Sequence, residues 1–179
     1  MLAGILGLLL LAQVPTVGPK AGPTPAPAVV RRSDDGIVLG AIGARDANLI
    51  EVAKLATTKA TAASARTYAA TLLKAHQLSL SAGTNLAKQL GVARLLPADS
   101  AMARGQVDVM AKLNVLSGTA FDRAFVQFIV DDHKAAITLL NGTLLAQAKQ
   151  LQVKTFIRQR VPILRSHQLM GEKWLAGNP

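Results

Sequence analysis

The sequence predicts an all-α protein, an up-and-down bundle of four long helices with one extra short helix. Half of the 179 residues are hydrophobic but only 3% are aromatic, because alanine and leucine, two strong helix formers, dominate the apolar set. From Ser33 onward the apolar residues recur with helical spacing. Short turns separate the helical segments, which is typical of antiparallel bundles.

An uninterrupted apolar run opens the chain, within residues 1–14. It is too short to cross a bilayer about 30 Å thick as a helix, but it has the length of the hydrophobic part of a secretory signal. Residues 15–32 are rich in proline and alanine, which predicts an extended, disordered linker. We therefore expect an exported protein whose folded domain covers residues 33–176. Whether the leader is cleaved or stays as an anchor is left open.

Capping residues and breaks predict where the helices begin and end. Ser33 is placed to cap the first helix, and Gly91 to end the second in a left-handed conformation. Thr119 and Asp122 have the spacing of a capping box at the start of the fourth. The predicted helices cover residues 34–60, 65–90, 101–116, 120–148 and 153–174.

Ionisable residues interrupt the apolar faces of these helices. His76, His133 and His167, the three histidines of the chain, each fall among leucine, isoleucine or phenylalanine on a helical projection. Glu51 shares the apolar side of the first helix. Counted from the turns at about 1.5 Å per residue, neighbouring members differ in height by only about 3 to 5 Å. Because buried imidazoles and carboxylates are costly alone, we expect the four side chains to meet in one layer.

This layer leads to the hypothesis of a transition-metal site. Three imidazoles and one carboxylate suit zinc, copper, iron or nickel. Neither His133 nor His167 has a glutamate three residues earlier, so a ferritin-type di-iron centre is not expected. The predicted ligands are Glu51, His76, His133 and His167. The residues predicted next to them are Asp122, Asp132 and Arg160.

Two other interpretations stay open. In the first, the inward polar residues form a structural core network, in which Arg160 pairs with Glu51 or Asp132 and Asp122 serves only as a cap. In the second, the net charge of +10 reflects a cationic module that binds anionic lipid or envelope polysaccharide. Its outward stripe would consist of Lys154, Arg158 and Arg165.

Other functional classes have little support in the sequence. The chain has no cysteine, which excludes disulfides, thiolate chemistry and cysteine-based zinc sites. It contains no Gly-x-Ser-x-Gly, phosphate-loop or HExxH motif, so we do not expect an enzyme of those kinds. The scarcity of aromatic residues also argues against nucleic acid as a partner. The oligomeric state is left open.

Several segments together resemble a family of small exported bacterial proteins, the ferritin-like domain of unknown function 4142, often described as outer membrane proteins. The carriers are ANLIEVAKLA around Glu51, LLKAH ending at His76, LSGTAFDRAFVQFIVDDH ending at His133 and VPILRSH ending at His167. The resemblance covers nearly the whole helical domain. It implies a ferritin-like bundle in the periplasm or outer envelope, and it implies no agreed activity.

Overall fold

The computed structural model describes residues 33–95 and 101–178, with side chains from residue 108 onward in the second range. The predicted leader and linker, residues 1–14 and 15–32, lie outside the described residues, as does the break at 96–100. The described part is helical, in the order α1 (Asp34–Lys59), α2 (Ala63–Leu90), α3 (Ala101–Val115), α4 (Gly118–Leu139), η1 (Leu140–Leu144), α5 (Leu145–Gln147) and α6 (Leu151–Gly177).

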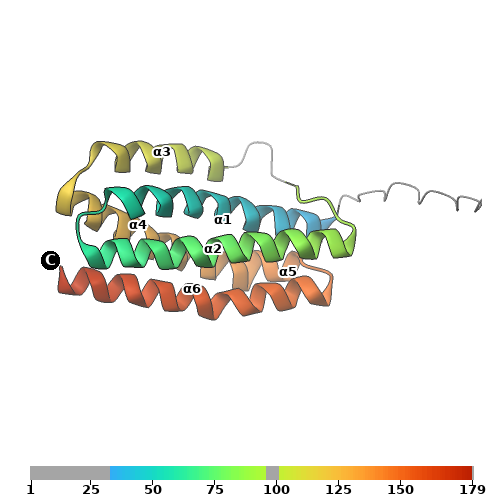
Figure 1. The fold of residues 1–179 in the computed structure, drawn as a ribbon. Coiled ribbons are helices and arrows are strands. Elements are labelled where there is room, and N and C mark those ends of the chain that lie inside the picture. Colours follow the sequence, from blue (N-terminus) through green and yellow to red (C-terminus); the bar gives the residue numbers. More distant parts are fainter. Residues whose placement is uncertain (1–32, 96–100, 179) are drawn as a thin grey trace, which may run out of the picture.

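Four long helices form the bundle, and the predicted fold class is confirmed. Figure 1 shows α1, α2, α4 and α6 running side by side, with the shorter α3 lying along the outer side of α1. The helices α1 and α2 form one hairpin, and α4 and α6 form the other. Contacts of α2 with α6 and of α1 with α4 join the two hairpins. Among the described residues, no helix is both long and apolar enough to cross a membrane.

The helix ends agree with most of the predicted caps. The Ser33 hydroxyl accepts a hydrogen bond of 3.1 Å from the Gly36 backbone N–H, and Gly91 ends α2 with a φ of 63°. The capping box predicted at Thr119 and Asp122 is wrong. The helix α4 starts two residues earlier, after Ser117, and the Asp122 carboxylate caps another helix instead.

Asp122 caps the start of α2. It accepts hydrogen bonds from the Thr61 N–H at 2.9 Å, the Ala62 N–H at 2.8 Å and the Thr61 hydroxyl at 2.7 Å. The residue is 1% exposed. A buried carboxylate is therefore stabilised by donors that the turn between α1 and α2 would otherwise leave unsatisfied. This local function explains its inward position without any contribution to the histidine layer.

Two features of the helices were not predicted. The fourth helix does not run straight to residue 148, because a π-helical segment, η1, follows α4. Such a widened turn is rare and often borders a functional site. On α1, Gly36 and Gly40 leave room for the backbone of the segment 93–95, and the Leu95 N–H donates to the Gly36 carbonyl at 3.1 Å.

The core consists of two apolar clusters with a polar layer between them. One cluster runs along α1 from Leu49 to Ala56 and includes Leu72 on α2, and the other includes Ile42 on α1 and Ala87 on α2. The helices α4 and α6 also contribute residues to both clusters. The buried polar residues that lie between the clusters are Asp46, His76, His133, Arg160 and His167.

Candidate metal centre

The structure brings the three histidines together from three helices. His76 lies on α2, His133 on α4 and His167 on α6, and their ring centroids are separated by 5.5, 6.0 and 5.5 Å. One ring nitrogen from each residue lies within 4.8 Å of the other two. The residues are 2%, 0% and 6% exposed. Three imidazoles therefore share one dry space near the middle of the bundle.

An aspartate on α1 holds the first of these rings. Asp46 is fully buried, and its Oδ1 lies 2.8 Å from His76 Nδ1 and 2.7 Å from Arg160 Nη2. Its Oδ2 accepts a hydrogen bond of 2.7 Å from the Ser79 hydroxyl. Sequence analysis did not identify this residue.

The Asp46 carboxylate is ionised despite its burial. Burial acts to raise its pKa, but the hydrogen bond from His76 and the positive charge of Arg160 outweigh that effect, and the pKa lies below its ordinary value. An ionised carboxylate only accepts hydrogen bonds. His76 therefore donates through Nδ1–H, and its Nε2 carries the free lone pair. This arrangement of carboxylate and imidazole is the one that orients a metal-ligating histidine.

Several ring nitrogens in the cluster have no hydrogen-bond partner among the described residues. They are Nε2 of His76, Nδ1 and Nε2 of His133, and Nδ1 of His167. Buried polar atoms of native proteins are nearly always satisfied, and each orphan costs about 1–3 kcal/mol. Because Nδ1 of His133 faces the Asp132 carboxylate at 3.4 Å, each of the three rings has one such nitrogen left for a bound species.

The environment keeps two of the rings neutral. Burial lowers the pKa of His133, and the neighbouring Asp132 opposes this only in part. Burial, together with the nearby His133, His76 and Arg160, lowers the pKa of His167 to about 4. A metal ion requires neutral imidazole, so these pKa shifts favour the state that can bind one.

Asp132 lies beside the cluster and pairs with α1. It forms a salt bridge of 2.7 Å with Arg45, and Arg45 also donates to the Asp132 backbone carbonyl. The carboxylate approaches His133 Nδ1 to 3.4 Å. Asp132 is thus placed next to a ligand candidate, as the sequence predicted, although its main partner is Arg45.

Other predicted site residues lie elsewhere. Glu51 is exposed and pairs with Lys54 at 2.8 Å, because α1 turns Asp46, and not Glu51, into the layer. The prediction of Glu51 as a ligand is therefore wrong in its geometry. Asp122 caps α2, away from the histidines. Arg160 does line the layer, but its partner is Asp46 rather than Glu51 or Asp132.

The cationic stripe lies on the outer side of α6. Arg158 and Arg165 are exposed, and Lys154 is partly exposed. None of the three forms an ion pair with the described residues.

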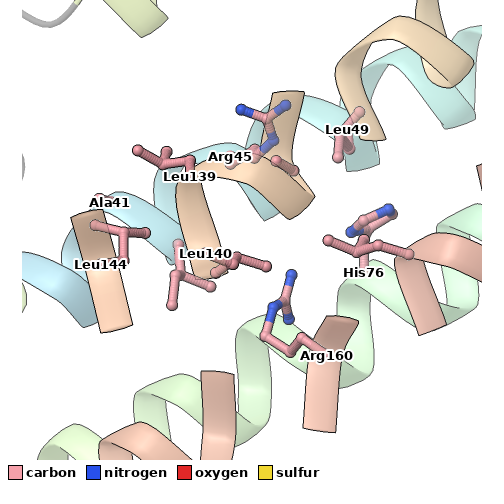
Figure 2. Close-up of a pocket in the computed structure, with 11 residues that line it drawn as sticks. Ala41, Arg45, Leu49, His76, Leu139, Leu140, Leu144 and Arg160 are labelled. Carbon is pink, nitrogen blue, oxygen red and sulfur yellow. The ribbon is translucent and has the colours of Figure 1, made fainter. Parts of the chain in front are cut away.

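Two cavities reach the polar layer. The first lies between α1, α4 with η1, and α6, and His76 and Arg160 border it together with apolar side chains such as Leu140 and Leu144 (Figure 2). The second lies between α2 and α6 and is bordered by His76, Arg160 and His167. Both cavities thus end at the same groups.

A contact between α2 and α6 fixes the third histidine. The Tyr68 hydroxyl donates a hydrogen bond of 2.7 Å to the backbone carbonyl of His167. Gly171 makes this approach possible, because a side chain there would collide with Val130 and with the Tyr68 hydroxyl. Burial raises the pKa of Tyr68, so the hydroxyl remains a donor.

Comparisons with known proteins identify relatives in fold and in sequence. A search of curated proteins found no match. Among solved structures, a Streptomyces coelicolor protein that carries the label DUF305 and is described as secreted has a similar fold, with a TM-score of 0.70 and 13% identity. The match covers 82% of this chain and 94% of that one. The family described as "Domain of unknown function (DUF4142)" matches residues 19–173, and the chain belongs to this family.

Proposed function

We propose that this domain binds one transition-metal ion through His76, His133 and His167. The observation that carries the proposal is the approach of three buried histidines on three helices, with one ring nitrogen from each within 4.8 Å of the other two. All three residues also have ring nitrogens without a hydrogen-bond partner among the described residues. A purely structural polar network would be expected to satisfy these atoms, as it does for Asp46. Here, ring nitrogens of all three histidines are instead left without a protein partner among the described residues.

The ligand chemistry favours zinc or copper. All three ligands are imidazoles, which both metals accept, and three histidines with one open position form a known type of zinc site. Asp46 would hold the His76 ring in the tautomer that binds through Nε2. Non-haem iron sites usually add a carboxylate ligand, and no carboxylate joins the three imidazoles as a ligand candidate among the described residues.

We further propose that the protein acts outside the cytoplasm, in the periplasm or outer envelope. The apolar run at residues 1–14 has the length of a secretory signal. The structural neighbour from Streptomyces coelicolor is itself described as secreted. A metal-binding domain in that location would take up an ion after export, and fractionation of the producing cells tests this location.

Elemental analysis of the full chain, purified without chelators and then loaded with zinc or copper, tests the metal site. We expect about one equivalent of metal per chain, and we expect His133→Ala to lose it. Glu51→Gln is the matched control, because this exposed carboxylate lies outside the cluster, and it should retain the metal. A folded protein that takes up neither ion would show that the cluster is only a polar part of the core.

A second candidate function is binding to an anionic surface through Lys154, Arg158 and Arg165. The exposure of the two arginines and the lack of ion pairs with the described residues favour it. Binding to vesicles with anionic lipid should then fall steeply with salt and in the double variant Arg158→Glu, Arg165→Glu. Equal binding by the double variant would exclude this stripe as the surface that binds anionic lipid.

A further inference from the structure

The charges around the histidine layer balance before any metal is added. Asp46 pairs with Arg160, and Asp132 pairs with Arg45. An imidazole binds a metal ion in its neutral form. A divalent ion on these ligands would therefore bring two uncompensated positive charges into a dry interior, which is costly unless an anion accompanies it.

One buried hydrogen-bond donor beside the layer is not used by the protein. Arg160 donates through Nη2 to Asp46 at 2.7 Å, but its Nε is buried and has no partner among the described residues. The residue is 7% exposed. It borders both cavities together with His76, and one of them also with His167. Arg160, whose Nε–H is unsatisfied, thus lines the same small cavities as two candidate ligands.

The cavities limit what could reach this donor. The one between α2 and α6 has a volume of about 30 Å³, and the one beside η1 about 20 Å³. A single water needs roughly 10–15 Å³ by the same measure. There is room for a ligand of one to three non-hydrogen atoms and none for a bulky one.

We propose that the position of the metal not taken by histidine binds a small monoanion, which accepts a hydrogen bond from Arg160 Nε. The inference rests on the proposed metal site and names the ligand class of that site. The anion, hydroxide or an external ion of similar size, lowers the local charge and satisfies the free donor. The cavity between α2 and α6 is its route, past Ile163, which borders that cavity and is 50% exposed.

Azide titration of the cobalt(II)-loaded full chain tests this proposal. Metal content is measured first in each sample. We expect the visible spectrum to change with one azide per metal, and benzoate, which is too large, to leave it unchanged. Arg160→Lys, which keeps a positive charge near Asp46 but lacks Nε, should weaken azide binding by about tenfold. Arg158→Lys on the exposed side of the same helix is the control and should behave as the unchanged protein.

A second variant addresses the route and does not disturb the buried ion pair. Ile163→Trp should narrow the entrance and slow azide binding, whereas Leu169→Trp, equally exposed on α6 but not bordering the cavity, should not. A metal-loaded protein that ignores azide, or whose azide affinity is the same in Arg160→Lys, would overturn the anion site alone. An unchanged rate of azide binding in Ile163→Trp would overturn the proposed route. A protein that holds no cobalt, zinc or copper would overturn the metal site and the anion site together.

Discussion

Asp46 on α1 and His76 on α2 are joined by a hydrogen bond of 2.8 Å between two side chains that are 1% and 2% exposed. The bond fixes which nitrogen of His76 is free. Asp46→Asn removes the negative charge and the preference for the Nδ1–H tautomer. We expect a metal affinity about 10 to 100 times weaker, measured by competition with a chromophoric chelator. Ser79→Ala removes a neutral partner of the same carboxylate and should have a smaller effect. Equal affinity in Asp46→Asn would show that Asp46 does not orient a ligand.

The stability of the metal-free protein should depend on pH through the buried histidines. His133 and His167 have pKa values below the ordinary 6.5, about 4 for His167, so the unfolded chain binds more protons than the folded one between these values. The contribution of these two histidines to the free energy of unfolding is therefore fully present above pH 6.5. It declines as the pH falls towards 4, by about 1.4 kcal/mol for each unit of pKa shift.

Urea denaturation between pH 7.5 and 4.5, in the presence of chelator, measures this decline. His167→Gln should make the decline of the free energy of unfolding with falling pH smaller. Asp46, whose pKa is lowered from 3.8, adds a further loss only when the pH falls below that value. A free energy of unfolding that stays constant down to pH 4.5 would contradict the assignment of neutral, buried rings.

Asp122 should matter for stability and not for metal binding. Its carboxylate satisfies two backbone N–H groups and one hydroxyl at the start of α2. Asp122→Ala leaves these donors in a buried turn, and we expect a loss of about 1–3 kcal/mol in the free energy of unfolding. Asp131→Ala, on the exposed side of α4, is the control for the effect of removing one negative charge from this helix. Loss of metal with an unchanged unfolding curve would assign Asp122 to the site after all.

The close approach of α1 to the segment 93–95 predicts an asymmetric response to alanine. Gly40→Ala would place a methyl group against the backbone of Leu95, whereas Gly142→Ala meets nothing within 4 Å. Alanine is favoured over glycine in a helix by about 1 kcal/mol. We expect Gly142→Ala to be neutral or stabilising and Gly40→Ala to be destabilising in thermal unfolding. A stabilised Gly40→Ala protein would show that the segment moves aside at little cost.

The sequence predicted the helices well because their ends carry strong local signals. Ser33 and Gly91 act through their own backbone neighbourhood, and such signals need no knowledge of the tertiary structure. The π segment Leu140–Leu144 was not predictable in this way. The segment contains Gly142, but a single glycine inside a helical pattern does not by itself predict a widened turn.

The histidines could be predicted, but the acid that supports them could not. Each histidine lies on a helix with a clear apolar face, so its inward direction follows from the spacing. On α1, glycine and alanine occur on all sides, and the face is poorly defined. Glu51 lies five positions after Asp46, about 140° around the helix. Only a large error in the assigned face exchanges the two acids, and the poorly defined face of α1 permits such an error. The signal that could have found Asp46 is its place between Ile42 and Leu49 in a regular buried series.

Arg160 shows a different limit of sequence reasoning. Its inward position was predicted, but its partner was not. Glu51 and Asp132 were the expected partners, and the rotation of α1 decides that Asp46, and not Glu51, faces Arg160. Only coordinates resolve that rotation. They place Arg160 on Asp46 and Arg45 on Asp132.

The division of the bundle into two hairpins has a consequence for how the protein matures. Asp46 and His76 belong to the α1–α2 hairpin, and His133 and His167 belong to the α4–α6 hairpin. Neither hairpin contains all three imidazoles. An ion held by all three histidines would therefore bind only after the two hairpins dock. The rate at which the absorption of bound cobalt appears during refolding would then report the rate of docking.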